Sequence, residues 1–242
     1  ELDHEVRDVA AAPGGLVVLS TSDGLVVVVD AADPSRPVEL ARLELDELAG
    51  APTRVALADG GLAVVAPAAA DGLVLVDLSD PASPLELGRG TPSGPATDVA
   101  LAGELAVVST GRVEYTDPDL GGIDLFDLHD PAAPVLVGSV AFDHSIAAVD
   151  VRGSLVVTVG GGFVHVLDIS DPAEPVEIGS LAGAPDHLSG VTVDHERAFV
   201  SVVPGSLLVV DLTDSAAPRL AGARSWQLWD GIDGSPAGGY DV

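Results

Sequence analysis

The stretch LVLVDLSDPASP, at Leu73–Pro84, decides the fold, because one copy of it precedes it in the chain and three follow. The other copies are LVVVVDAADPSRP (Leu25–Pro37), IDLFDLHDPAAP (Ile123–Pro134), VHVLDISDPAEP (Val164–Pro175) and LLVVDLTDSAAP (Leu207–Pro218). The first Asp of each copy is separated from that of the next by 47, 50, 41 and 43 residues. This spacing is typical of four-stranded propeller blades.

Each repeat divides into four short strands. In the third repeat, an inner strand is predicted at Thr97–Ala102, a second at Leu105–Ser109 and, after the motif strand, a fourth at Val135–Val140. The Val-rich runs are bounded by Gly, Pro and Asp, which favours strands over helices. Their apolar residues stand at consecutive positions, as expected of strands buried on both faces. The predicted fold is therefore all-β: a β-propeller of four-stranded antiparallel blades, with five repeats and the start of a sixth.

Turn formation is the expected role of the D-x-x-D-P-x-x-P segment that ends each copy. The first Asp ends the third strand, the second can accept a hydrogen bond from the backbone ahead of it, and the first Pro presets φ in the turn. The last Pro opens the fourth strand. Ser215 replaces the first Pro in the fifth copy, where a less tight turn is expected.

The repeated pattern resembles that of the LVIVD-repeat family of bacterial and archaeal β-propellers. In that family, an (L/I)xI(V/I)D(V/I)SDPxxP segment is followed by a DVAVxGxxAYVA strand pair. The second element is represented here by TDVALAGELAVV (Thr97–Val108), RVALADGGLAVV (Arg54–Val65) and DVRGSLVV (Asp150–Val157). The resemblance covers essentially the whole chain. It implies a propeller that serves as a surface or exported binding scaffold, and it implies no active site.

The repeats predict one propeller domain over residues 1–242. Its approximate repeats are 4–51, 52–95, 96–146, 147–190 and 191–239, and residues 240–242 match the opening of a blade. Two interpretations follow: either these last residues close a five-bladed ring, or the chain is a fragment of a six- or seven-bladed protein. Natural proteins avoid unpaired sheet edges, which favours the longer chain.

Composition excludes several classes of function. The 242 residues include 38 Asp and Glu, ten Arg, no Lys and no Cys, and the formal net charge is −28. An acidic chain repels nucleic-acid phosphates, and no apolar stretch reaches the roughly 20 residues that cross a bilayer. No nucleic-acid partner and no membrane insertion are therefore expected. Without Lys and Cys there is no P-loop lysine, Schiff base, thiol nucleophile or zinc–thiolate site, and no catalytic sequence motif is present.

The loops of a propeller divide between its two faces. In a four-stranded antiparallel blade, the 2→3 and 4→1 connections open on one face, and the 1→2 and 3→4 connections on the other. The D-P turns are 3→4 connections, whereas the irregular insertions Leu43–Ala51, Gly111–Gly122 and Ser225–Gly239 fall on the opposite face, which we call the loop face. Irregular loops on one side of a rigid scaffold are the usual place for binding.

Four residues of these insertions are the candidates for contacting a protein or glycan partner: Trp226, Trp229, Tyr115 and Glu114. The two Trp are the only ones in the chain. Paired aromatic side chains on a loop anchor protein partners or stack on sugar rings. The alternative is that the two Trp cover the hydrophobic edge of the last blade.

Three histidines suggest a metal site on the same face. His4, His144 and His187 each follow an Asp and precede an inner strand by four or five residues, and Asp8 and Asp98 stand at strand starts. Imidazole and carboxylate groups that converge on the channel mouth would bind a divalent metal. The alternative is a polar loop that recurs because the blade recurs. The remaining histidines are expected to be solvated or satisfied within the core: His129, His165 and His195.

The stretch DPDLGGID, at Asp117–Asp124, resembles part of a calcium-binding loop. Its candidate ligands are Asp117, Asp119 and Asp124. The pattern is incomplete, because Gly121 provides no side-chain oxygen and Leu128 stands where the bidentate Glu of an EF-hand would be. The alternative is a solvated turn.

Together these features predict a non-enzymatic binding or scaffold module that presents its loop face to a protein or glycan partner. We expect it to be exported or surface-associated (extracellular, cell surface or periplasmic) and to be a subunit of a larger complex. Calcium or another divalent metal is the only cofactor that the residues suggest. One alternative is a metal-dependent propeller hydrolase with an Asp/His site at the channel mouth. Another is a purely structural role in a cell-surface layer.

Overall fold

The computed structural model describes residues 5–45, 53–58, 60–67, 72–111, 121–184 and 187–225. These residues form twenty β-strands and no helix, so none of them belongs to a helix that could cross a membrane. The strands pair into five four-stranded antiparallel sheets, each formed by four strands that are consecutive in the chain. We call these sheets blades 1 to 5.

The blades have the following strands. Blade 1 contains β1 (Val6–Ala11), β2 (Leu16–Thr21), β3 (Leu25–Asp30) and β4 (Val38–Glu44), and blade 2 contains β5 (Thr53–Leu57), β6 (Leu62–Pro67), β7 (Leu73–Asp77) and β8 (Leu85–Gly90). Blade 3 contains β9 (Ala96–Ala102), β10 (Leu105–Thr110), β11 (Gly121–Asp127) and β12 (Val135–Phe142). Blade 4 contains β13 (Ala148–Arg152), β14 (Leu155–Gly160), β15 (Phe163–Asp168) and β16 (Val176–Ala182), and blade 5 contains β17 (Leu188–Asp194), β18 (Arg197–Val202), β19 (Ser206–Asp211) and β20 (Arg219–Ser225).

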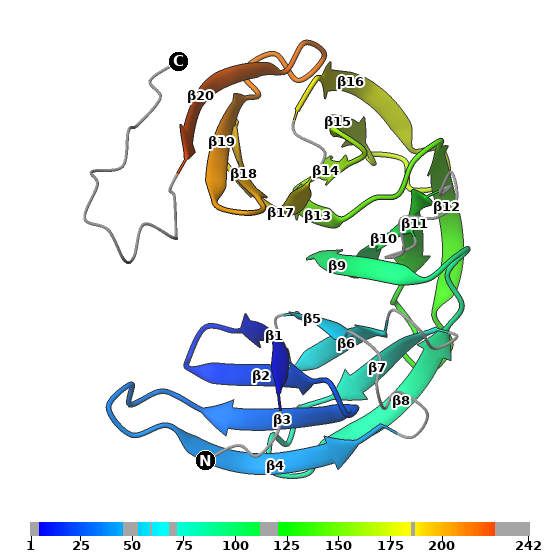
Figure 1. The fold of residues 1–242 in the computed structure, drawn as a ribbon. Helices are drawn as coiled ribbons and strands as arrows, with labels where there is room; N and C mark the ends of the chain where they lie inside the picture. The colour runs from blue at the N-terminus through cyan, green and yellow to red at the C-terminus, as the bar shows by residue number, and fades with distance from the viewer. Residues whose placement is uncertain are drawn as a thin grey trace, which may run out of the picture.

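The blades follow one another around an arc, as in a propeller (Figure 1). Their first strands lie innermost, where β1 contacts β5, β5 contacts β9, β9 contacts β13 and β13 contacts β17. The predicted fold class is therefore confirmed. An opening separates blade 1 from blade 5 in Figure 1. Residues 240–242, the predicted start of a sixth blade, lie outside the described residues, and β17 begins at Leu188, inside the predicted fourth repeat.

The hydrophobic cores lie between the blades. In β11, Ile123 and Leu125 pack toward blade 4, whereas Phe126, on the other side of the same strand, packs toward blade 2. The middle strands of blades 2, 3 and 4 thus bury both of their faces, which explains why apolar residues occupy consecutive positions in the sequence.

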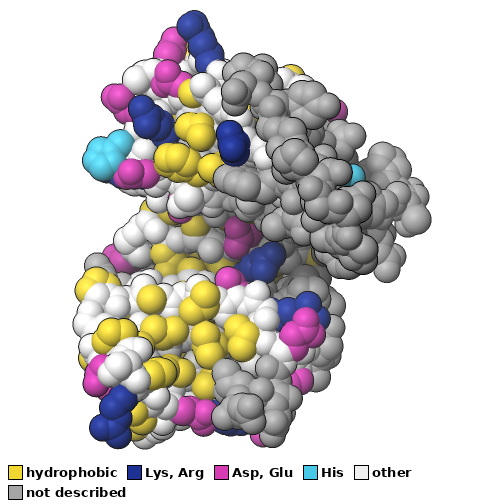
Figure 2. All heavy atoms as spheres, turned by 60° about the vertical axis from the view of Figure 1, so that its left-hand side comes forward, with side chains coloured by type: hydrophobic (Ala, Val, Ile, Leu, Met, Phe, Trp, Pro, Cys, Tyr) yellow, Lys and Arg dark blue, Asp and Glu magenta, His cyan; other side chains and the backbone are white. Residues whose placement is uncertain are grey.

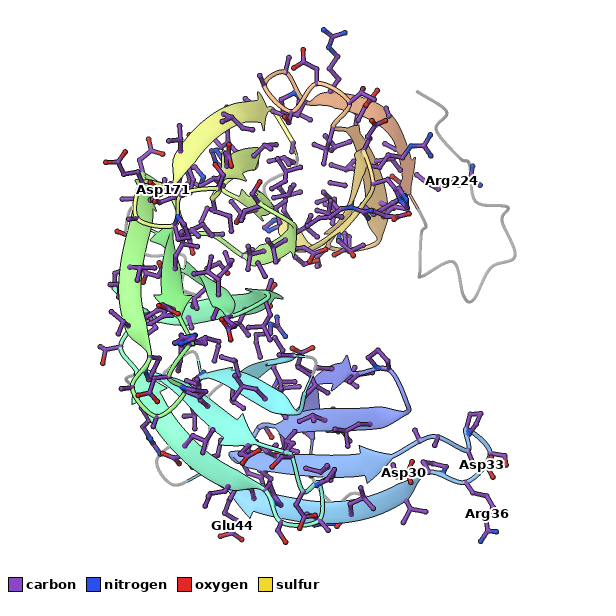
Figure 3. All side chains as sticks on the ribbon, turned by 180° about the vertical axis from the view of Figure 1, so that it is seen from behind. Asp30, Asp33, Arg36, Glu44, Asp171 and Arg224 are labelled. Atoms are coloured by element: carbon purple, nitrogen blue, oxygen red, sulfur yellow. The ribbon has the colours of Figure 1, made fainter. Side chains whose placement is uncertain are left out.

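Asx hydrogen bonds form at both Asp positions of the D-P turns, whereas the sequence predicted them for the second Asp only. The Oδ1 atom of the first Asp accepts a hydrogen bond from the backbone N–H two residues later in every copy; the acceptors are Asp30, Asp77, Asp127, Asp168 and Asp211, at 2.8 to 2.9 Å. The second Asp does the same in four copies, at 3.0 to 3.1 Å. Figure 3 shows Asp30, Asp33 and Asp171 at the periphery of the arc.

Three glycines of the fourth strands allow the D-P turns of blades 3, 4 and 5 to pack against the blade before them. A Cβ atom on Gly88, Gly138 or Gly179 would lie 2.6, 2.1 or 2.3 Å from a backbone carbonyl oxygen in the turn of the next blade. Contacts that short are sterically forbidden, so only glycine fits these positions without movement of the backbone. Gly222 has the same register in blade 5, but no atom of the described residues lies within 4 Å of its Cβ position.

Among the described residues, no blade packs against the side of blade 1 that faces the opening. Val9 is 58% exposed there, whereas Val55, Val99 and Val149, which have the same register in the next three blades, are buried. Figure 2 brings this side forward and shows hydrophobic side chains gathered on its lower half, where blade 1 lies. Val6 and Leu40 of this blade are also exposed.

The glycine contacts generate a first prediction. Gly138→Ala should lower the free energy of unfolding by about 2 kcal/mol, because the added methyl group overpacks the backbone of the next turn. Gly222→Ala, the matched control, should change it by less than about 0.5 kcal/mol, because its methyl group meets open space. Urea unfolding followed by circular dichroism measures both. Equal losses in the two variants would contradict the proposed role of the blade-to-turn contact.

Candidate functional site

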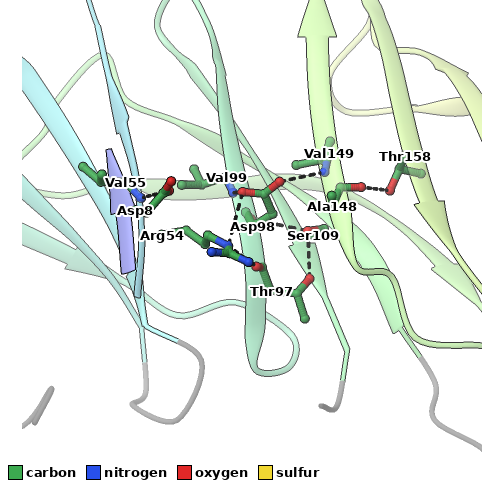
Figure 4. A network of polar contacts seen from close by, with 10 residues as sticks. All are labelled: Asp8, Arg54, Val55, Thr97, Asp98, Val99, Ser109, Ala148, Val149 and Thr158. Carbon is green, nitrogen blue, oxygen red and sulfur yellow. Dashed lines mark hydrogen bonds and ion pairs between the residues drawn. The ribbon is translucent and has the colours of Figure 1, made fainter. Parts of the chain in front are cut away.

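Carboxylates of the inner strands join neighbouring blades. Asp8 Oδ2 accepts a hydrogen bond from Val55 N–H, and Asp98 Oδ2 accepts one from Val149 N–H, both at 3.0 Å (Figure 4). In blade 4 the side chain of Asp150 reaches the backbone of Val193 in the same way, at 2.6 Å. Two of the predicted metal ligands, Asp8 and Asp98, therefore hold the inner strand of the next blade.

The boundary between blades 2 and 3 uses a cation instead. Arg54 has the register that Asp8 and Asp98 have in their own blades. Its Nε–H donates a hydrogen bond to the carbonyl oxygen of Thr97 at 3.2 Å, and Nε lies 4.0 Å from Asp98 Oδ1. The contact between these blades is thus also polar (Figure 4). Here the side chain of the earlier blade donates and the backbone of the later blade accepts, the reverse of the Asp contacts.

Burial raises the pKa of Asp98 to about 6. Withdrawal from solvent is the largest cause, and the negative charge of Asp8 adds to it. The N–H groups of Val149 and Val99 and the charge of Arg54 act in the opposite direction, because they stabilise the ionised carboxylate. Burial outweighs them.

A second polar group lies on the loop face, where blade 3 meets blade 4. His144 belongs to the 4→1 connection between β12 and β13, and His165 lies in β15. Their Nε2 atoms are 3.0 Å apart. His144 Nδ1 lies 2.8 Å from Asp143 Oδ1, and His165 Nδ1 lies 2.9 Å from Glu177 Oε1. The four side chains form one continuous series: Asp143, His144, His165 and Glu177.

Aromatic rings and a glycine surround this pair. The Phe163 ring stacks on His144 with centroids 5.0 Å apart, and the Phe142 ring lies 4.3 Å from that of His165. Gly161, in the hairpin between β14 and β15, has φ +54° and leaves room for the imidazole, because a Cβ there would lie 2.5 Å from the His144 ring. The side chains of His165 and His144 are only 6% and 16% exposed.

Burial lowers the pKa of His165, and the charge of His144 acts in the same direction. The hydrogen bond to Glu177 and the charges of Glu177 and Asp143 oppose this shift. The pKa of Asp143 is lowered by its hydrogen bond with His144 and by the charge of that ring. The series therefore combines two accessible carboxylates with two largely enclosed imidazoles.

His165 was expected to be solvated or satisfied in the core, and it is buried and hydrogen-bonded. Its register is that of a core residue, three positions before the motif Asp. Blades 2 and 5 have Val74 and Leu208 at that position, both buried toward the preceding blade. The pairing with His144 was not predicted. A polar residue at a position that is apolar in other repeats was the signal that could have revealed it.

Asp124 occupies the same register in blade 3 and is also buried. Its Oδ2 atom accepts a hydrogen bond from Ser93 N–H at 2.6 Å, and its Oδ1 atom has no hydrogen-bond partner among the described residues. The end of the predicted calcium loop thus lies within β11, which begins at Gly121. The calcium site stays a prediction, because Asp117 and Asp119 lie outside the described residues.

The other predicted site residues divide into two groups. His187 is exposed and immediately precedes β17, and His129 and His195 are exposed as well. The remaining candidates lie outside the described residues: His4, Glu114, Tyr115, Trp226 and Trp229. Within the described part of the chain, no group of three or more His, Asp or Glu side chains is placed to hold a metal ion. The site at the channel mouth stays a prediction because it includes His4.

Comparison with known sequences identifies the repeat. The LVIVD-repeat profile matches residues 58–91 and 154–182, which contain the second to fourth strands of blades 2 and 4. No curated protein sequence matches the chain.

Solved structures share the fold at low sequence identity. A functionally unknown protein from Desulfotomaculum acetoxidans DSM 771 is 12% identical, with a TM-score of 0.71 over 92% of this chain and 70% of its own. Sqt1 from Saccharomyces cerevisiae is 10% identical, with a TM-score of 0.66 over 92% and 63%. KlHsv2 with loop 6CD replaced by a Gly-Ser linker is 13% identical, with a TM-score of 0.58 over 87% and 64%. The chain thus spans about two thirds of the length of these structures, and the likeness concerns the fold alone.

The buried carboxyl of Asp98 generates a second prediction. Its pKa of about 6 in the folded protein exceeds the ordinary value of 3.8, so the folded state binds this proton more tightly than the unfolded state. The contribution of Asp98 to stability therefore falls as pH rises through this interval. The free energy of unfolding of Asp98→Asn should rise by about 2 kcal/mol relative to that of the parent as the pH increases from 4 to 7. Urea unfolding at several pH values measures this difference.

Asp171→Asn, in an exposed D-P turn, is the control for the loss of one negative charge. Its free energy of unfolding should follow that of the parent closely over the same pH range. A parallel pH dependence of Asp98→Asn and the parent would show that this carboxyl does not titrate as described.

Proposed function

Because this chain is an LVIVD-repeat protein built of β-propeller blades, we propose that it acts as a non-catalytic binding module. Its loop face contacts a protein or glycan partner. The module is exported or surface-associated and works as a subunit of a larger complex. We do not extend the proposal to hydrolysis, because nothing in the described contacts or in the comparisons favours it.

The contrast between the two faces supports this proposal. All five 3→4 connections have seven residues: 31–37, 78–84, 128–134, 169–175 and 212–218. Three of them pack their backbone against a glycine of the preceding blade. The 2→3 connections of the loop face instead range from two residues, at 161–162, to ten, at 111–120. The 3→4 turns of one face are thus uniform in length, and three of them take part in blade packing, whereas the 2→3 connections of the loop face vary, as binding surfaces on rigid scaffolds do.

Charge narrows the class of protein partner. The net charge of −28 favours a basic or neutral surface over an acidic one. Among glycans, it favours neutral sugars over sulfated or uronic-acid polymers, which would be repelled. Association with a basic partner should therefore weaken as salt concentration rises.

A glycan array and an array of basic peptides, each probed with the full chain, test the proposal. Binding to the best ligand is then measured for Trp226→Ala/Trp229→Ala, which changes the loop face. We expect at least a tenfold loss of affinity, because buried aromatic anchors dominate such interfaces.

Val135→Ser is the matched control, because Val135 is an exposed apolar residue at the end of a D-P turn, on the opposite face. It should bind like the parent. Full retention of binding by the double Trp variant, weakening by Val135→Ser alone, or the absence of any ligand on both arrays would each count against the proposed function.

A further inference from the structure

His144 and His165 meet through two nitrogen atoms that have the same hydrogen-bonding role. Each Nδ1 atom lies within 2.9 Å of a carboxylate oxygen, of Asp143 in one case and of Glu177 in the other. A carboxylate only accepts hydrogen bonds, so each Nδ1 carries a proton and donates it. In a neutral imidazole, the other nitrogen then holds a lone pair. Both Nε2 atoms are therefore acceptors, and they face each other at 3.0 Å.

Two lone pairs at that distance repel each other unless a cation lies between them. The cation can be a proton, which makes one ring an imidazolium, or a metal ion bound by both rings. The carboxylates of Asp143 and Glu177 stabilise either cation. A proton, however, bonds covalently to only one of the two Nε2 atoms and leaves one ring charged, although His165 is almost completely enclosed and the rings of Phe142 and Phe163 flank the pair. Imidazole nitrogen is, in contrast, a good ligand for zinc, copper and nickel.

We propose that His144 and His165 bind a divalent transition metal, with Zn²⁺ as the reference ion, through their Nε2 atoms. This inference is independent of the proposed partner. The site differs from the one predicted at the channel mouth, because it includes His165 and lies where blade 3 meets blade 4.

The geometry fits such an ion. With Zn–N bonds of about 2.0–2.1 Å and a tetrahedral angle, two nitrogen ligands lie about 3.3 Å apart. The observed 3.0 Å requires a separation of the rings by only about 0.3 Å. His144 is partly exposed, so water has access to complete the coordination.

The carboxylates have the role expected around a bound metal. Histidines that ligate a metal usually donate their other N–H to a carboxylate, which fixes the ring and raises its basicity. Asp143 and Glu177 provide this contact on both sides. Their two negative charges also balance the two positive charges of the metal. A calcium ion is not expected here, because calcium takes oxygen ligands.

Zn²⁺ alone, titrated into chelator-treated full chain, tests the proposal. Excess Mg²⁺ is present to occupy the acidic surface. Calorimetry should give one Zn²⁺ per chain, and Co²⁺ at the same site should develop visible absorption bands. His165→Leu should weaken Zn²⁺ binding at least tenfold and abolish the Co²⁺ bands. Leu is chosen because Leu208 occupies this register in blade 5.

Two further variants complete the experiment. His195→Ala removes an exposed histidine that also contacts a carboxylate, Asp194, and it should bind Zn²⁺ like the parent. Glu177→Gln leaves both ligands in place and should weaken binding about tenfold, because the buried ring loses its carboxylate. This variant tests the site even if His165→Leu does not fold.

Three results would overturn the proposal. The first is the absence of Zn²⁺ binding in excess Mg²⁺. The second is equal Zn²⁺ affinity in the parent and in both His165→Leu and Glu177→Gln. The third is a ¹⁵N-detected imidazole Nε2–H that persists when Zn²⁺ is added, which would show that the pair shares a proton instead.

Discussion

In blades 2, 3 and 4, the burial of both faces of the middle strands depends on the blades on either side. A single four-stranded sheet with Val and Leu at consecutive positions exposes one apolar face whichever way it turns, and packing between two neighbours removes both faces from water. The cores accordingly lie between blades and not within them. The Asx turns and the fourth-strand glycines serve the same requirement, because they set how closely one blade approaches the next.

Polar contacts fix the position of each blade relative to its neighbour, at an energetic cost. Hydrophobic burial alone would allow neighbouring sheets to slide, whereas the hydrogen bond from Val149 N–H to Asp98 fixes one register. The cost is a carboxyl group held where its charge is poorly solvated, which is why its pKa rises. Arg54 makes the equivalent contact without this cost, because a guanidinium donates to a carbonyl oxygen and keeps its charge partly in solvent. The chain thus uses two chemistries for one geometric task.

The fold could be predicted from the sequence because its signals are local. The predicted strands Leu105–Ser109 and Val135–Val140 correspond to β10 (Leu105–Thr110) and β12 (Val135–Phe142), and their starts coincide. Apolar runs, turn residues and the repeat length suffice for that. The pairing of His144 with His165 could not be predicted in this way, because the residues are 21 positions apart and meet only when blade 4 packs on blade 3. The role of Gly138 could not be predicted from local sequence either, because it packs against the turn of another blade.

The contact between Gly138 and the following turn has a direction along the chain. In all three such contacts, the turn comes from the later blade and covers a glycine of the earlier one. When a blade leaves the ribosome, the glycine of the preceding blade, against which its turn packs, has therefore already been synthesised. Each new repeat covers apolar surface that its predecessor had left open to water. If the blades assemble in the order of their synthesis, the growing chain exposes two sheet faces at a time, the outer side of blade 1 and the free side of the newest blade.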